Sequence, residues 1–138
     1  LKQLRARPER HRGVRCSRWR FEQLVSRAYA RLPQPVQATL VNIAITVEDV
    51  PSGEELDGHG PLGLYQGTPL TERTSAYGNV LPDRVLIFQG PHERAADDED
   101  DLVVAIGETL IHEIGHYFGL SEEEIEAIEE RYWRGEAE

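Results

Sequence analysis

The chain of 138 residues, with a mass of 15.6 kDa, is long enough for one domain with a single core and short for a protease with separate substrate-binding lobes. Hydrophobic residues make up 39% of it, and no apolar run approaches the roughly 20 residues of a membrane span, so we expect no membrane-spanning role. A single cysteine, Cys16, and the lack of an apolar signal-like segment at the N-terminal end favour a cytoplasmic protein.

Charge is segregated along the chain. Residues 1–20 hold eight Lys or Arg and one acid, whereas residues 92–138 hold sixteen acids and three Arg. A basic arm can bind nucleic acid, but the net charge of −10 argues against a nucleic-acid-binding domain. Residues 1–16 show no apolar period, so we predict a basic, flexible tail followed by one domain over residues 17–138. Nothing in the sequence indicates an oligomeric state.

The first predicted helix follows this tail. Ser17 is a suitable N-cap, and apolar residues recur at helical spacing after it. Pro33 and Pro35 stop this pattern. We therefore predict a helix over residues 18–32.

Three segments are typical of strands. Branched residues alternate with others in residues 40–47, which predicts a strand with one apolar face. Residues 62–67 (LGLYQG) are bounded by glycine and followed by Pro69, the profile of an edge strand. Residues 84–89 (RVLIFQ) form a mostly apolar run, which predicts a central strand buried on both faces.

Two helices are predicted in the acidic half. Five consecutive acids provide the N-cap and first turn of a helix over residues 98–118, whose apolar residues lie on nearly all sides and place it at the centre of the domain. Gly119 can take the left-handed conformation that ends a helix. Ser121 and Glu124 match a capping box, which starts a last helix over residues 122–133.

The central predicted helix carries His112, Glu113 and His116 in HExxH spacing. Residues four apart on a helix lie one turn apart on the same side, so both imidazoles can reach one cation. Two neutral histidine nitrogens suit Zn²⁺, and Glu113 is placed to act as general base for an attacking water. Glu108 lies too far along the axis from His116 to share its ion and is a candidate outer partner of His112. The competing interpretation is two histidines satisfied within the core.

A catalytic zinc site usually has three protein ligands, so a third is needed. The segment reads H-E-x-x-H-x-x-G-x-x-E, in which Gly119 permits a sharp turn and Glu122 ends the pattern. A carboxylate is an acceptable zinc ligand, so we expect Glu122 to be the third, with Glu123 in reserve. Two alternatives stay open: Glu122 can simply start the last helix, where an acid suits the helix dipole, or Glu126 or Glu129 can bind instead.

This pattern is the metzincin motif with an acid in place of the third histidine, but the chain contains no methionine for a Met-turn. The sequence instead resembles a small bacterial family of predicted minimal zincin-like metallopeptidases. The resemblance covers about residues 20–130 and rests on the stretches LGLYQGTPLTERT, LPDRVLIFQGP and TLIHEIGHYFGLSEEEI. It implies an α+β fold in which a small mixed sheet packs on a central HExxH helix, with an N-terminal and a C-terminal helix, and one Zn²⁺ per chain.

The resemblance also implies where a substrate binds. In zincins an extended peptide adds as a strand to the edge of the sheet, which here would be formed by Leu64, Tyr65, Gln66 and Gly67. Tyr65 and Tyr77 are candidate donors to a developing oxyanion, with packing as the competing role. The expected partner is thus a peptide or protein substrate.

Two functions follow as hypotheses. The first is a zinc-dependent metallopeptidase that hydrolyses peptide bonds with Glu113 as general base. The second is a catalytically weak or inactive zincin-fold module that binds or regulates partners through its edge strand or its charged surfaces.

Overall fold

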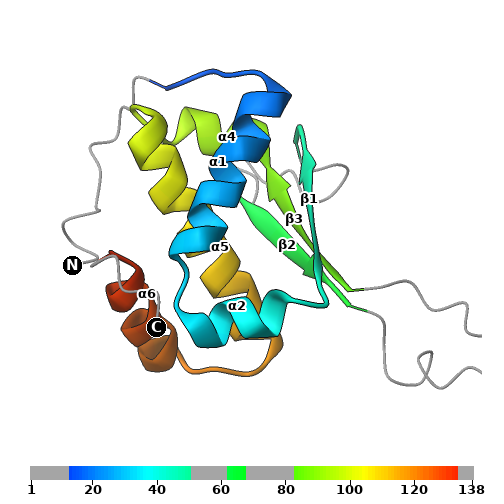
Figure 1. Ribbon diagram of the computed structural model, residues 1–138, viewed down its shortest axis with the longest axis vertical. Coiled ribbons are helices and arrows are strands. Elements are labelled where there is room, and N and C mark those ends of the chain that lie inside the picture. Colours follow the sequence, from blue (N-terminus) through cyan, green and yellow to red (C-terminus); the bar gives the residue numbers. More distant parts are fainter. Residues whose placement is uncertain (1–12, 51–61, 68–82, 134–138) are drawn as a thin grey trace, which may run out of the picture.

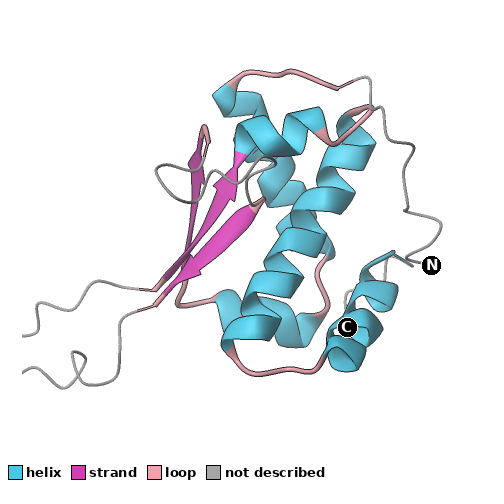
Figure 2. Cartoon of the chain, turned by 180° about the vertical axis from the view of Figure 1, so that it is seen from behind, coloured by secondary structure: helices cyan, strands magenta, loops and turns pink. Residues whose placement is uncertain are grey.

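The computed structural model describes residues 13–50, 62–67 and 83–133. In Figures 1 and 2 the strands form a layer on one side of the molecule and the long helices pack against it. This arrangement confirms the predicted α+β class. The elements in chain order are α1 (Arg18–Arg31), α2 (Gln34–Leu40), β1 (Ala44–Glu48), β2 (Gly63–Gln66), β3 (Arg84–Phe88), α4 (Gln89–Arg94), α5 (Glu99–Tyr117) and α6 (Glu122–Trp133).

The sheet within these residues is mixed and has the order β1-β3-β2. Strand β3 pairs in parallel with β1 and antiparallel with β2. Four of its five residues are buried, which follows from its apolar sequence and confirms it as the central strand. Strand β2 lies at one edge, as predicted.

Helix α5 is the centre of the fold. It contacts α1, α4, α6, β2 and β3, and its apolar residues are buried on several sides. The core that it shares with α1 and β3 includes Phe21, Leu24, Val85, Ile87, Leu102, Ile106 and Leu110. No helix in the described ranges is both long and apolar enough to cross a membrane.

Three predicted helix starts are confirmed by their caps. The side chains of Ser17 and Asp98 each accept a hydrogen bond from the backbone N–H at the third position of the helix that follows, at 3.0 and 2.8 Å. Ser121 and Glu124 exchange side-chain to backbone hydrogen bonds of 3.1 and 2.7 Å. Each cap satisfies N–H groups that have no partner inside the helix.

The predicted strand over residues 40–47 is wrong in its first half. Residues up to Leu40 belong to α2, and the strand begins at Ala44. The two prolines that end the first helical pattern also start this second helix, because Pro33 is the N-cap of α2 and Pro35 lies in its first turn, where no N–H is required. Val41, expected on the apolar strand face, is 71% exposed just after α2.

The short helix α4 was not predicted. It follows β3 directly, and Gln89, Pro91 and His92 are buried on it. A helix of six residues has too few turns to show a periodic pattern, so tertiary contacts rather than propensity stabilise it.

Part of the predicted basic tail contacts α4. The backbone N–H groups of Val14 and Cys16 donate to the carbonyl oxygen and the side chain of Glu93, both at 3.0 Å. Residues 1–12 lie outside the described residues.

Candidate metal centre

The two motif histidines lie one turn apart on α5. Their ring centroids are 5.8 Å apart and the rings are inclined by 72°. The side chain of His112 is 26% exposed and that of His116 is 55% exposed. The i, i+4 spacing therefore places both rings on one accessible side of a core helix.

Glu113 faces the edge strand. The backbone N–H of Tyr65 donates to Glu113 Oε1 at 2.9 Å. Phe88 N–H bonds to Leu62 O at 2.9 Å, and because such bonds alternate along an antiparallel strand, the Tyr65 N–H points away from β3. Burial raises the pKa of the Glu113 carboxyl above its ordinary value, and the bond from Tyr65 and the two histidines oppose this in part. The carboxylate thus lies beside the edge of β2.

The Tyr65 ring joins β2 to the end of α5. It stacks on Tyr117 with centroids 3.8 Å apart, and its hydroxyl donates to Asp83 Oδ2 at 2.6 Å. The hydroxyl is therefore used in holding the edge strand. Tyr77, the other tyrosine considered as a donor, lies outside the described residues.

Glu122 reaches the second histidine. Gly119 has φ of 77°, the left-handed conformation that glycine adopts readily, and α5 ends before it. After this turn Glu122 Oε2 lies 3.1 Å from His116 Nε2. Glu123 is exposed on the first turn of α6. Of Glu122 and its reserve Glu123, Glu122 is the one that contacts a histidine.

A second carboxylate contacts the first histidine. Glu129, on α6, is fully buried, and its Oε2 lies 2.7 Å from His112 Nδ1. The same ring nitrogen is 3.1 Å from the backbone oxygen of Glu108. The expected outer contact from Glu108 to His112 is thus made by its carbonyl group.

These groups border a cleft of about 340 Å³ between α5, α6 and the start of β2. The cleft is lined by both histidines, by the candidate base Glu113 and by the buried acid Glu129. Its lining residues are Leu62, Gly63, Ala105, Glu108, Thr109, His112, Glu113, His116 and Glu129.

A family model described as zincin-like metallopeptidase matches residues 40–132, about two thirds of the chain. The chain belongs to the zincin-like metallopeptidase family. Among solved structures, a conserved hypothetical protein from "Thermo thermophilus" is similar, with a TM-score of 0.55 and 21% identity over 75% of this chain and 94% of that chain. At 21% identity, this similarity is evidence for a shared fold and not for a shared function. No protein with a curated description matches the chain.

The donor types at the centre of this zincin-like metallopeptidase fit zinc. Imidazole nitrogen and carboxylate oxygen are both ordinary zinc ligands. Within the part of the chain that the structure describes, however, no three His, Cys, Asp or Glu side chains are gathered around one point. The two nearby carboxylates lie against different rings, Glu122 against His116 and Glu129 against His112.

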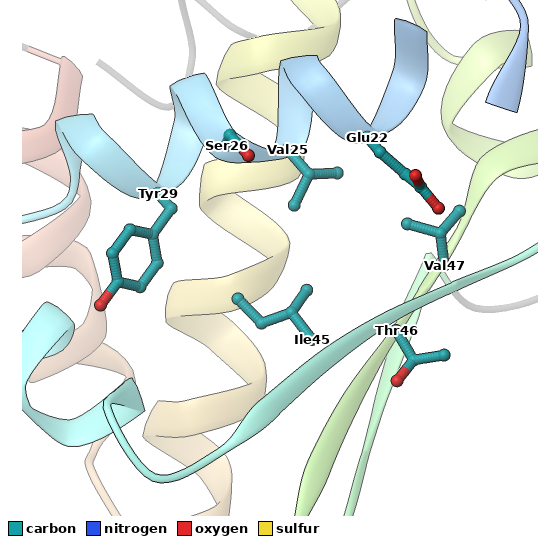
Figure 3. Close-up of a pocket in the computed structure, with 7 residues that line it drawn as sticks. All are labelled: Glu22, Val25, Ser26, Tyr29, Ile45, Thr46 and Val47. Atoms are coloured by element: carbon teal, nitrogen blue, oxygen red, sulfur yellow. The ribbon is translucent and has the colours of Figure 1, made fainter. Parts of the chain in front are cut away.

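A second cavity, of about 460 Å³, lies between α1 and β1 and is separate from this centre. Ile45 and Val47 point from β1 toward α1, whereas Thr46 points away (Figure 3). Among the described residues that line it, only Glu22 is charged at neutral pH, so these residues offer no pair of groups for metal or acid–base chemistry. The residues that line it are Glu22, Val25, Ser26, Tyr29, Ile45, Thr46 and Val47.

One buried histidine next to the cleft was not found from the sequence. His92 is fully buried, with Nδ1 2.9 Å from Phe88 O and Nε2 2.9 Å from Thr109 Oγ1. Burial lowers its pKa from 6.5 to about 4, so the ring is neutral at physiological pH. A histidine inside an unpredicted helix gave no pattern by which to find it.

Proposed function

We propose that this member of the family is a zinc-dependent peptidase with Glu113 as general base. The observation that supports it most is the hydrogen bond from the edge-strand N–H of Tyr65 to Glu113 Oε1. This bond keeps a half-buried carboxylate, on the helix that carries both histidines, next to the edge of β2, where we propose that an extended peptide binds.

His112 and His116 would hold the ion, with Glu122 as the proposed third ligand. When bound, zinc would polarise the scissile carbonyl and lower the pKa of the attacking water. Glu113 takes a proton from that water on a carboxylate oxygen and passes it to the nitrogen of the leaving amine. A raised carboxyl pKa suits this role, because a stronger base accepts the proton more readily.

The substrate is proposed to be a peptide or protein segment that adds to β2. Leu64, Tyr65, Gln66 and Gly67 form the proposed binding edge. The backbone of an added strand supplies affinity through main-chain hydrogen bonds, and it passes beside Glu113 because that carboxylate lies at the same edge.

Metal content and peptide cleavage test this proposal together. Elemental analysis of the purified full chain should find one zinc per chain, which His112→Ala or His116→Ala should abolish. A mixed peptide library analysed by mass spectrometry should be cleaved by the zinc-loaded chain and left intact after chelation. A zinc-free chain that takes up no added zinc and cleaves nothing would instead favour the binding-module hypothesis.

A further inference from the structure

Helix α6 lies very close to α5 at two glycines. A Cβ built on Gly107 would lie 2.0 Å from Tyr132 Cζ. One built on Gly115 would lie 2.6 Å from Ile125 Cγ1. Residues 125, 129 and 132 have the spacing of one helix face, so Glu129 points at α5 between these two contacts. Close helix packing therefore holds a carboxylate against the middle of the HExxH helix.

This carboxylate is unusual for its surroundings. Glu129 is fully buried, and the neighbours on its face, Ile125 and Tyr132, are also fully buried. Burying an acid in an apolar core costs stability unless the acid is paired, and an apolar residue of similar size would often serve the core better. The contact at 2.7 Å from Glu129 Oε2 to His112 Nδ1 is the feature that an apolar residue would not supply.

We propose that Glu129 is a positioning residue that holds His112 as the tautomer protonated on Nδ1, an inference that rests on the proposed zinc site. His112 Nδ1 lies 2.7 Å from Glu129 Oε2 and 3.1 Å from the carbonyl oxygen of Glu108. A carboxylate oxygen and a carbonyl oxygen can only accept, so a ring proton on Nδ1 suits both of these close neighbours. Nε2 then keeps its lone pair for the metal.

This role differs from that of a ligand. Glu129 makes His112 a better-oriented and more basic ligand without binding zinc itself, as carboxylates behind metal-bound histidines commonly do. The carboxylate ligand then remains Glu122, which contacts the other histidine. Glu122 and Glu129 of α6 thus have separate tasks, one toward each ring.

Zinc affinity tests the proposal without any enzyme assay. The full-length variants Glu129→Leu and Glu129→Gln are titrated with zinc against a chromophoric chelator, and circular dichroism confirms that they fold. We expect Glu129→Leu to weaken zinc binding about 10- to 100-fold and Glu129→Gln to weaken it less. Glu130→Gln is the matched control, because it removes the same charge from the next, exposed position of the helix and should leave the affinity unchanged.

Two spectroscopic readouts separate the proposed role from others. Ring ¹⁵N shifts of His112 in the metal-free wild-type chain at neutral pH should show the proton on Nδ1. X-ray absorption of zinc-loaded Glu129→Leu should show the wild-type number of ligands, and loss of one oxygen ligand would make Glu129 a ligand and overturn the proposal. An Nε2-protonated ring, or unchanged zinc affinity in folded Glu129→Leu, would also overturn it.

The same measurements distinguish failure of the peptidase proposal from failure of the proposal about Glu129. If the wild-type chain binds zinc, and Glu129→Leu weakens this binding without changing the number of ligands, the role of Glu129 stands even where no peptide is cleaved. If peptides are cleaved and both Glu129 variants bind zinc like the wild type, the peptidase stands and the role of Glu129 is rejected.

Discussion

Tyr65 donates its backbone N–H to Glu113 Oε1 at 2.9 Å, which joins the proposed base of this zincin-like metallopeptidase to the edge of the sheet. The Tyr65 ring strengthens the same connection by stacking on Tyr117, one helical turn beyond Glu113. Strand β2 and helix α5 therefore position the base together, so a change that separates them is expected to impair catalysis even when zinc stays bound.

The choice of third ligand can be tested with two adjacent acids. Glu122→Ala should weaken zinc binding by at least the roughly 10- to 100-fold that outer contacts are worth, because Glu122 Oε2 already lies 3.1 Å from His116 Nε2. Glu123→Ala removes the same charge from the same helix turn and should leave the affinity unchanged. Chelator competition measures both. Equal losses in the two variants would mean that the negative charge of the helix start, rather than ligation, explains the effect.

Gly107→Ala should destabilise the fold although alanine favours helices. The new Cβ would overlap the ring of Tyr132, and this overpacking is expected to cost about 3 kcal/mol, more than the ~1 kcal/mol gained in helix propensity. Denaturant unfolding measures the loss. In a Tyr132→Ala background the space is open, so the same substitution should cost nothing further, and additive effects of the two changes would contradict the clash as the cause.

Stability should fall between neutral and mildly acidic pH because of His92. Its pKa is near 6.5 when unfolded and about 4 when folded, so the unfolded chain binds more protons in this window. The contribution of the neutral ring is complete above pH 6.5 and is lost as the pH falls toward 4, amounting to roughly 2 kcal/mol by pH 5.

Urea unfolding of metal-free wild-type and His92→Gln chains at pH 7 and pH 5 measures this contribution. The wild-type chain should lose about 2 kcal/mol more than the variant over that interval. Because both chains keep the other histidines, the difference isolates His92. Equal losses in the two chains would show that His92 does not titrate as its burial requires.

Local signals predicted much of the fold. Ser17, Asp98 and the Ser121–Glu124 pair mark helix starts through hydrogen bonds that span only three residues, so the sequence alone contains them. The side chains of the apolar run in β3 are buried on both faces of the sheet, which is typical of a central strand. In contrast, α2 was not predicted, because a proline that stops one helix is equally suited to the first turn of the next.

The candidate site was less predictable. The HExxH spacing and Gly119 act within one helix and one turn, and they led to Glu122 directly. The contact of Glu129 with His112 depends instead on how closely α6 approaches α5, a tertiary distance that no local pattern encodes. A signal did exist, because Glu129 shares its helical face with Ile125 and Tyr132, and that spacing marks it as buried.

The most direct test of the proposed mechanism is Glu113→Gln, which keeps the size of the side chain and removes the base. The variant should bind one zinc per chain with wild-type affinity, because the amide replaces no proposed ligand. Its rate of peptide hydrolysis should fall by about 10²- to 10⁴-fold, the usual contribution of a general base. Peptide hydrolysis by zinc-loaded Glu113→Gln at the wild-type rate would contradict the mechanism.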